Sequence, residues 1–211
     1  MQKLTEIILK KHPARVLADY EVAILLSGNA DRRYGLVKRA LAAGELIQVR
    51  RGLYAVSPIL SGQPVDLFEL AGRIYGPSYV SLESALAFHG LIPEAVHSVT
   101  SITLKRSLEF KTPLGVFSYV RIPSFGLFSG VERKSSSGGI SFIAEPLKAL
   151  ADYAFVHKKK WMSFRDAVED LRLDEGELGA WTVAQVDELL PFYGSRWVRN
   201  FLKQVRRGLV P

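Results

Sequence analysis

Hydrophobic residues recur at helical spacing through the first part of the chain, and the pattern then changes to that of short strands. The spacing predicts three helices, over residues 2–11, 17–26 and 31–43. Two short apolar runs, residues 46–49 and 53–56, enclose the turn Arg50-Arg51-Gly52 and predict a hairpin. Three helices followed by a hairpin are typical of a winged helix-turn-helix, which we expect over residues 1–58.

The remainder of the chain predicts two further regions. Residues 57–64 hold two prolines and a glycine and indicate a linker. A central mixed α/β domain is expected over residues 65–155, with helices over 66–75 and 81–88 and strands over 98–104, 116–122 and 140–144. A helical C-terminal region is expected over residues 156–211, where helices begin at Ser163, Thr182 and Ser195. The fold class is therefore α+β.

The predicted third helix carries charge on one face. On a helical wheel Leu36, Val37 and Ala40 form the inner face. We expect its N-cap at Asp31, with Arg33 leaning toward the apolar side. A recognition helix places its outward residues at base edges, and a hairpin turn reaches the neighbouring backbone. The candidate DNA contacts are Arg32, Arg33, Lys38, Arg39, Arg50 and Arg51.

The net charge is concentrated at the same end. The chain has a formal net charge of +7, and residues 1–60 hold 10 Lys and Arg against 5 Asp and Glu. Residues 61–150 hold 8 against 7, and residues 151–211 hold 10 against 9. A basic domain on a nearly neutral body suits a protein that docks one end on phosphates.

Composition excludes several classes of chemistry. The chain has no cysteine and four histidines, which removes disulfides and thiolate zinc sites and leaves little for any metal. No glycine-rich phosphate loop leads into a helix, so we expect neither metal nor cofactor. No apolar run is long enough to span a membrane, and Glu6 interrupts the N-terminal apolar stretch, unlike a signal peptide. We expect a cytoplasmic protein without membrane contact.

The last predicted helix, over residues 195–207, has two distinct faces. Trp197, Phe201 and Val205 are among its apolar positions, and the opposite face is basic. Such a helix is typical of a docked surface helix, and its charges also suit phosphates or an acidic partner protein. This second basic face comprises Arg196, Arg199, Lys203, Arg206 and Arg207.

Several blocks occur together in a recognisable order. They are RRGLYAV at 50–56, YVSLESALAFHGLIPE at 79–94, SVTSITLKR at 98–106 and FIAEPLKALADYAF at 142–155. In this order they resemble the AbiEi family of transcriptional-regulator antitoxins, from about Asp31 to Phe155. The last block departs from the family pattern P-E-K-A-L-x-D, because Leu147 stands where the family has glutamate, whereas Lys148 and Asp152 match.

The resemblance implies a repressor that binds inverted repeats of double-stranded DNA upstream of its own operon. It also implies the antitoxin role of a type IV toxin-antitoxin system, which opposes a nucleotidyltransferase toxin without necessarily binding it. We expect two copies to pair on the DNA, since one small reading head buries too little surface for high specificity.

Two alternatives to a DNA-binding repressor are a metal-dependent nuclease and a protein-interaction module. A metal-dependent nuclease would use Glu145 and Lys148 after the strand that begins at Ile140, but a helix start there would direct these side chains away from a strand-borne metal. Structural roles are expected for His89 and His97, so we predict no enzyme. The other alternative is a protein-interaction module without specific DNA binding, which would show a much weaker salt dependence.

Overall fold

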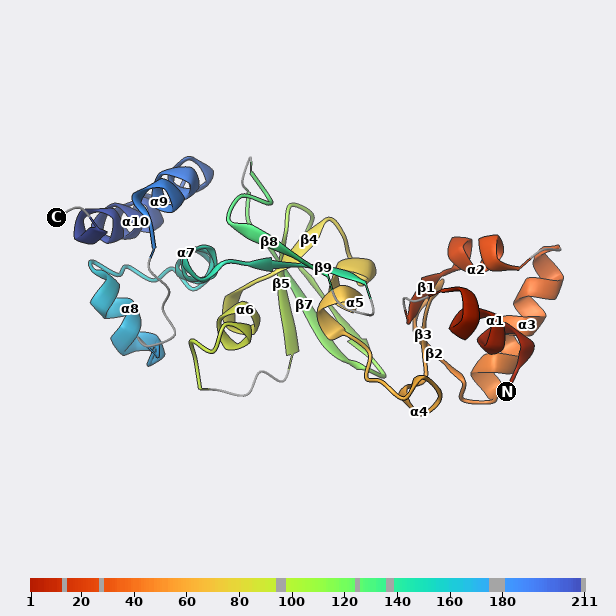
Figure 1. Ribbon diagram of the computed structural model, residues 1–211. Coiled ribbons are helices and arrows are strands. Elements are labelled where there is room, and N and C mark those ends of the chain that lie inside the picture. Colours follow the sequence, from red (N-terminus) through yellow and green to blue (C-terminus); the bar gives the residue numbers. More distant parts are fainter. Residues whose placement is uncertain are drawn as a thin grey trace.

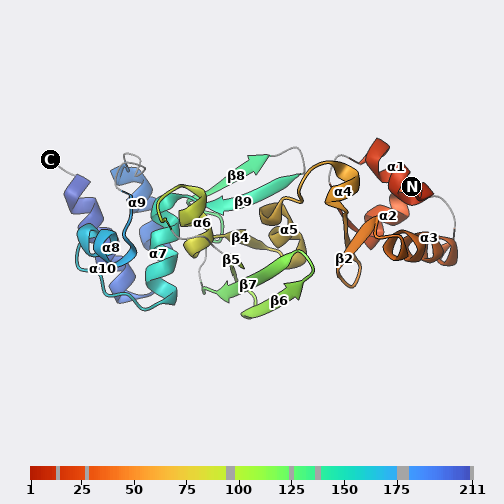
Figure 2. The same cartoon turned by 90° about the horizontal axis from the view of Figure 1, so that it is seen from below.

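The computed structural model describes residues 1–12, 15–26, 29–93, 98–123, 126–135, 139–174 and 181–209. The molecule is elongated, with an N-terminal domain at one end, a six-stranded sheet in the middle and a group of helices at the other end (Figure 1). The two chain ends lie at opposite ends of the molecule, and a view turned by 90° shows the same order of parts (Figure 2). The protein is therefore α+β, as the sequence predicts.

The N-terminal domain combines three helices with a small antiparallel sheet. Its elements are α1 (Lys3–Lys11), β1 (Val16–Ala18), α2 (Asp19–Leu25), α3 (Ala30–Ala42), β2 (Leu46–Arg50) and β3 (Leu53–Val56). The strand order is β1-β3-β2. The predicted helix over 17–26 is wrong at its start, because residues 16–18 form a strand that pairs with residues 53–55 of β3. That partner is distant in sequence, so no local pattern marks the strand.

Strand β3 is buried on both of its faces. Leu53 and Ala55 belong to the large core that continues into the central sheet, whereas Tyr54 and Val56 pack among the N-terminal helices. Successive side chains of a strand point to opposite faces, which explains how one four-residue strand serves two cores. The outer face of the small sheet is therefore covered by the central part of the chain.

The central part is built on a mixed six-stranded sheet. Its elements are α4 (Pro58–Ser61), α5 (Leu67–Ile74), β4 (Ser78–Val80), α6 (Leu82–Phe88), β5 (Ser98–Thr103), β6 (Leu108–Thr112), β7 (Gly115–Arg121), β8 (Val131–Ser135) and β9 (Ile140–Ala144). The strand order is β6-β7-β5-β4-β9-β8, in which β5 and β7 are parallel, as are β4 and β9. Helix α5 lies toward the N-terminal domain, and α6 lies toward the C-terminal helices (Figures 1 and 2).

Four of these elements are absent from the sequence prediction. The linker expected over 57–64 contains the short helix α4, which begins with a proline in its first turn. Strand β4 has only three residues, and β6 and β8 are edge strands with many exposed positions. Edge strands with little buried surface lack the apolar alternation on which a sequence prediction depends.

The C-terminal part is helical, as predicted. It contains α7 (Pro146–Val156), α8 (Phe164–Leu171), α9 (Val183–Leu189), the 3₁₀ turn η1 (Leu190–Phe192) and α10 (Arg196–Leu209). The predicted capping box is confirmed, since Thr182 and Gln185 bond reciprocally at the start of α9. Trp161 and Phe201 belong to the same core cluster as the sheet residues, so the hydrophobic core continues past residue 155.

A buried polar cluster joins the sheet to the C-terminal helices. Lys148 is 1% exposed and Asp152 is fully buried, with 3.1 Å between Nζ and Oδ1. The Tyr193 hydroxyl donates to Asp152 Oδ1 at 2.6 Å and accepts from Lys148 Nζ at 2.9 Å. The hydroxyls of Tyr79 and Ser81 both donate to Oδ2 at 2.8 Å. The predicted helix start at Ser81 is confirmed, because Ser81 is the N-cap residue of α6, but its hydroxyl donates to Asp152 and does not cap the helix. The sequence does not predict this contact, because Ser81 and Asp152 come together only in the folded chain.

None of the helices within the described ranges is long and apolar enough to cross a membrane.

Candidate nucleic-acid interface

Helix α3 presents most of its charged residues to solvent. Leu36, Val37 and Ala40 are buried against the N-terminal core, while Arg32, Lys38 and Arg39 are exposed and Arg33 is half-buried. The N-cap is Asn29, whose Oδ1 accepts from the backbone N–H of Arg32 at 3.0 Å. The expectation of an N-cap at Asp31 is therefore wrong by two residues. Asp31 lies in the first turn of α3, where its negative charge interacts favourably with the helix dipole.

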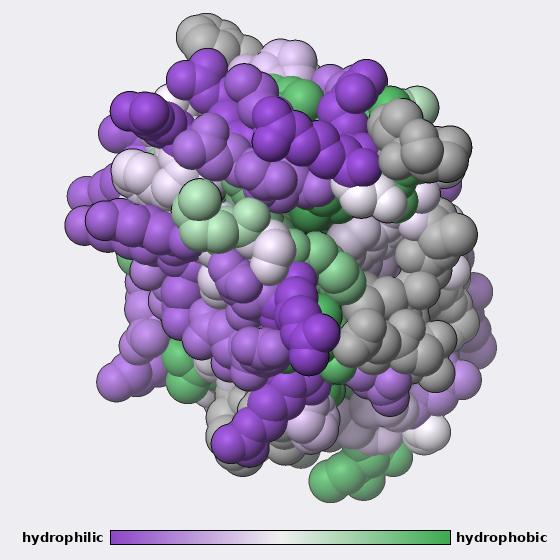
Figure 3. Space-filling view, turned by 90° about the vertical axis from the view of Figure 1, so that its left-hand side faces the viewer, coloured by the Kyte–Doolittle hydropathy of each residue, from purple (hydrophilic) through white to green (hydrophobic). Residues whose placement is uncertain are grey.

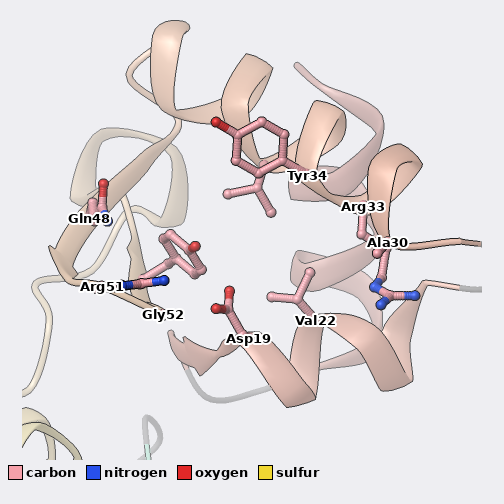
Figure 4. Close-up of a pocket in the computed structure, with 10 residues that line it drawn as sticks. Asp19, Val22, Ala30, Arg33, Tyr34, Gln48, Arg51 and Gly52 are labelled. Carbon is pink, nitrogen blue, oxygen red and sulfur yellow. The ribbon is translucent and has the colours of Figure 1, made fainter.

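A groove of about 450 Å³ separates α3 from the β2–β3 turn. Val22, Val37 and Tyr54 contribute its apolar lining. Asp19 and Arg51 point into it from α2 and from the turn, and Tyr34 faces them from α3 (Figure 4). Tyr34 is 70% exposed, so its ring is available to a ligand that enters the groove. Ala30, Arg33, Gln48 and Gly52 complete the lining.

The β2–β3 turn is attached to the start of α2. The backbone N–H of Asp19 donates to the carbonyl of Gly52 at 3.0 Å. Gly52 has a φ of +74°, and a Cβ at this position would lie 2.9 Å from Asp19 Oδ2. The turn therefore requires glycine both for its backbone conformation and for the close approach of the carboxylate. This contact holds the turn at a set position relative to α2 and α3.

Burial and the Asp19 carboxylate also act on Tyr54 at the base of the groove. Burial, together with a hydrogen bond to the Asp19 carboxylate, raises the pKa of the Tyr54 hydroxyl to about 12. The hydroxyl is therefore a neutral donor at physiological pH.

The two exposed arginines of α3 lie on a different flank from Tyr34. Successive helix residues are turned by about 100°, so Arg32 and Arg39 share one flank, which is turned by about 150° from Tyr34. A Cβ on Gly35 would lie 3.5 Å from Nη1 of Arg39, so the guanidinium of Arg39 extends over the glycine. Helix α3 thus offers cations on one flank and the groove on the other, with Lys38 between them.

The structure separates the two arginines of the turn. Arg51 lines the groove. Arg50 is paired in register with Leu53, whose side chain points to the central core. Burial raises the pKa of Tyr119 on β7, and the nearby charge of Arg50 lowers it, which places Arg50 on the side of the central sheet. The sequence predicts both arginines as DNA contacts. In the structure Arg51 lines the groove beside α3, whereas Arg50 is exposed and is not among the residues that line it.

The second basic face lies at the opposite end of the molecule from α3 (Figure 1). Its prediction from the hydrophobic pattern is confirmed in structure, because Val198, Phe201, Leu202 and Val205 are buried. Arg206 is paired with Asp187, with 2.7 Å between Nε and Oδ1. The remaining four cations, Arg196, Arg199, Lys203 and Arg207, are exposed.

The residues weighed for a nuclease have other contacts. Lys148 is held in the buried cluster, and Glu145 is the N-cap residue of α7 and accepts from Gln185 Nε2 at 3.4 Å. His89 follows α6 as its C-cap residue, and its Nε2 lies 2.8 Å from the carbonyl oxygen of Ala144 on β9. His97 lies outside the described residues. Across the described ranges, no group of three histidine, aspartate or glutamate side chains is placed to hold a metal ion.

Comparison with known protein families finds no family that matches this chain, and a search of curated proteins finds no significant match. The assignment of function therefore depends on the sequence and on the geometry of the N-terminal domain.

Proposed function

We propose that this protein binds double-stranded DNA through a winged helix-turn-helix formed by its N-terminal domain, and that it acts as a sequence-specific repressor. In this proposal α3 enters the major groove, which admits one α-helix. Arg39 and Arg32 read base edges or contact the flanking phosphates. The β2–β3 turn is the wing, and its Arg51 binds the phosphate backbone. Arg33 and Lys38 contribute charge beside them.

The observation that carries the proposal is the relation between α3 and the turn. The element order α1-β1-α2-α3-β2-β3 and the strand order β1-β3-β2 place a hairpin turn beside an exposed cationic helix. A groove with Arg33 and Arg51 on its margins lies between them. The bond between Asp19 N–H and the Gly52 carbonyl keeps this arrangement in place before a ligand arrives. Such preorganisation reduces the entropy lost on binding.

The proposal is tested by fluorescence anisotropy with the DNA upstream of the protein's own gene. About five phosphate contacts predict that log K falls against log salt with a slope of about −4.5. Binding should withstand unrelated competitor DNA. Arg39→Ala should reduce affinity, and Arg106→Ala, which removes an exposed cation from the central part, is the matched control. A shallow salt dependence, or equal losses in both variants, contradicts the proposal and favours an interaction module.

Pairing on DNA is a separate part of the proposal. One reading head covers a small surface, so specific binding requires two copies on an inverted repeat. Sedimentation of the protein with operator DNA should show two bound copies. A single bound copy at saturating protein contradicts pairing and leaves the binding mode of α3 unaffected.

The resemblance to the AbiEi family extends the proposal to an antitoxin. It supports a role in opposing a nucleotidyltransferase toxin encoded beside this gene. Co-expression of the two proteins should restore growth that the toxin alone arrests. Continued arrest, with both proteins present at normal levels, contradicts the antitoxin role without affecting DNA binding.

A further inference from the structure

A small aromatic pocket lies at the end of the molecule opposite to α3. Its volume is about 240 Å³. Trp161 and Met162 line it from the segment between α7 and α8, and Trp197 and Asn200 line it from α10. Lys160 and Arg196 stand at its margin. The volume is below the range of about 300–1,000 Å³ that small-molecule sites occupy, and it suits one bulky side chain.

The two indole rings present carbon to this pocket. Trp161 Nε1 donates to Asp170 Oδ2 at 2.9 Å, and Trp197 Nε1 donates to the Ala154 carbonyl at 3.2 Å. Both polar N–H groups are thus satisfied inside the protein. Met162 at the margin is 66% exposed, so its side chain is available to an occupant of the pocket. The pocket therefore favours an apolar occupant.

The basic face of α10 continues from the pocket. At 100° per residue, Arg196, Asn200, Lys203 and Arg207 lie along one line of the helix, with Arg199 beside it. This line extends for about 16 Å from Arg196 to Arg207. In the described part of the chain, no ion pair involves any of these four cations. Seen from this end, strongly hydrophilic side chains cover most of the surface and isolated apolar patches lie between them (Figure 3).

We propose that this pocket and the basic face of α10 bind an acidic segment of a partner protein. One bulky apolar side chain of the segment, such as leucine or phenylalanine, enters between Trp161 and Trp197. The acidic residues that follow it pair with Arg196, Arg199 and Lys203. Buried apolar anchors supply most of the affinity in such contacts, whereas complementary charges supply orientation and association rate. This site is separate from the proposed DNA interface.

The described contacts disfavour nucleic acid as the occupant. A base needs an open aromatic face on which to stack. Trp161 is only 6% exposed, because its ring stacks on Tyr153 at 6.0 Å with an angle of 2° and meets Phe201 at 5.3 Å. Little of the Trp161 ring is therefore open to a base, whereas an apolar side chain needs only limited contact with it.

Charge disfavours a second copy of the chain as the occupant. The chain carries a net charge of +7. Its most acidic stretch, residues 166–188, holds eight acidic residues against one basic, and three of these carboxylates, Glu169, Asp170 and Asp187, are already ion-paired within the chain. A basic face that docks on another copy of a basic protein meets repulsion. A partner with a run of aspartate or glutamate meets attraction instead.

The test uses an array of twelve-residue peptides rich in aspartate and glutamate, in which one central position is varied through all twenty amino acids. Fluorescently labelled full-length protein should bind most strongly when this position is leucine, methionine, phenylalanine or tryptophan, and only weakly when it is serine. The best peptide is then measured in solution by anisotropy. No preference for apolar residues, or no binding at all, overturns the proposal.

Two variants separate the pocket from the charges. Asn200→Trp fills the pocket from an exposed position and should abolish the apolar preference. Reversal of Arg196, Arg199 and Lys203 to glutamate should weaken the best peptide at least about tenfold. The matched control reverses Arg106, Lys111 and Arg121, which are exposed on the central part, and should leave affinity within about twofold. Equal losses in both triple variants contradict a localised site.

Two further measurements exclude the other occupants. Labelled single-stranded dT20 should not compete with the best peptide when salt is held at 150 mM, and efficient competition overturns the proposal in favour of nucleic acid. Sedimentation velocity of the protein alone tests whether a second copy occupies the pocket. We expect a monomer. Self-association that the Asn200→Trp substitution removes would assign the pocket to a second copy instead. Thermal melts verify that every variant is folded.

Discussion

Arg50 and Arg51, although adjacent, leave the β2–β3 turn on different sides. Arg51 lines the groove beside α3. Arg50 is in register with Leu53 and places its charge near Tyr119 of the central sheet. The pleat of the strand and the irregular register between Gln48 and Arg50 produce this separation. Only one of the two charges is therefore placed to act together with helix α3.

The different positions of Arg50 and Arg51 predict that their substitution by alanine affects DNA binding unequally. Arg51→Ala should weaken binding to all sequences alike and reduce the magnitude of the salt slope by about 1, as the loss of one phosphate contact requires. Arg50→Ala should leave affinity and slope nearly unchanged. Both are measured by anisotropy over a salt series. If Arg50→Ala is the more damaging variant, the orientation of the turn proposed for the complex is wrong.

The substitution Gly35→Ala should change the stability of the protein and its affinity for DNA in opposite directions. Alanine in place of a helical glycine stabilises a helix by about 0.5–1 kcal/mol, and a Cβ here meets only Arg39 Nη1, at 3.5 Å. We therefore expect a higher melting temperature. DNA affinity should fall, because the added methyl group keeps the helix backbone away from the floor of the DNA major groove. A more stable protein with unchanged affinity contradicts a close approach of DNA at Gly35.

Two glycines of positive φ form a matched pair for the attachment of the turn. Gly44 has a φ of +65° with no atom within 4 Å of an added Cβ, whereas at Gly52 that Cβ meets Asp19 Oδ2 at 2.9 Å. Gly44→Ala should cost about 1–2 kcal/mol through its backbone conformation alone. Gly52→Ala should cost more in urea unfolding. The excess should vanish in an Asp19→Ala background, and its persistence there excludes the carboxylate as the cause.

The buried cluster around Asp152 predicts a large loss of stability. Asp152→Ala leaves the 1% exposed Lys148 ammonium without its carboxylate, which should lower the free energy of unfolding by about 3–5 kcal/mol. Asp187→Ala removes the partner of Arg206 at the surface and should cost less than about 1 kcal/mol. Chemical denaturation measures both. Similar losses from the two variants would mean that Lys148 finds another partner or water.

Glu69 predicts a pH dependence of stability. Its side chain is 4% exposed, and burial raises its pKa from 4.5 to about 7, although the Arg73 charge lowers it. Between these two values the folded protein binds a proton that the unfolded chain has lost, so the free energy of unfolding falls as the pH rises from about 4.5 to about 7. Above about 7 this contribution is constant.

Glu69→Gln removes this contribution and provides the test. The variant should gain stability relative to the wild type as the pH rises from 5 to 7, and the difference should then remain level up to pH 8. Urea unfolding at each pH measures it. A difference that does not change between pH 5 and pH 7 contradicts a raised pKa of Glu69. The comparison with glutamine cancels the titration of the other groups.

Local patterns in the sequence predicted many elements correctly. The capping box at Thr182 and the two faces of α10 depend on residues within a few positions of each other, and both agree with the structure. Strand β1 was missed because its partner β3 lies more than thirty residues away. The role of Ser81 was missed for the same reason, since its hydroxyl donates to Asp152, 71 residues further along the chain.

The candidate site likewise has some features that the sequence predicted and others that only the tertiary structure decided. The sequence by itself determined which residues of α3 are buried and where its cations lie, because helical periodicity follows from spacing alone. Only the tertiary structure decided that Arg51 and Tyr34 border one groove, that Arg50 faces the central sheet, and that Trp161 and Trp197 enclose a pocket. Each of these depends on the packing of segments distant in sequence, and the free energy of that packing has no local signature.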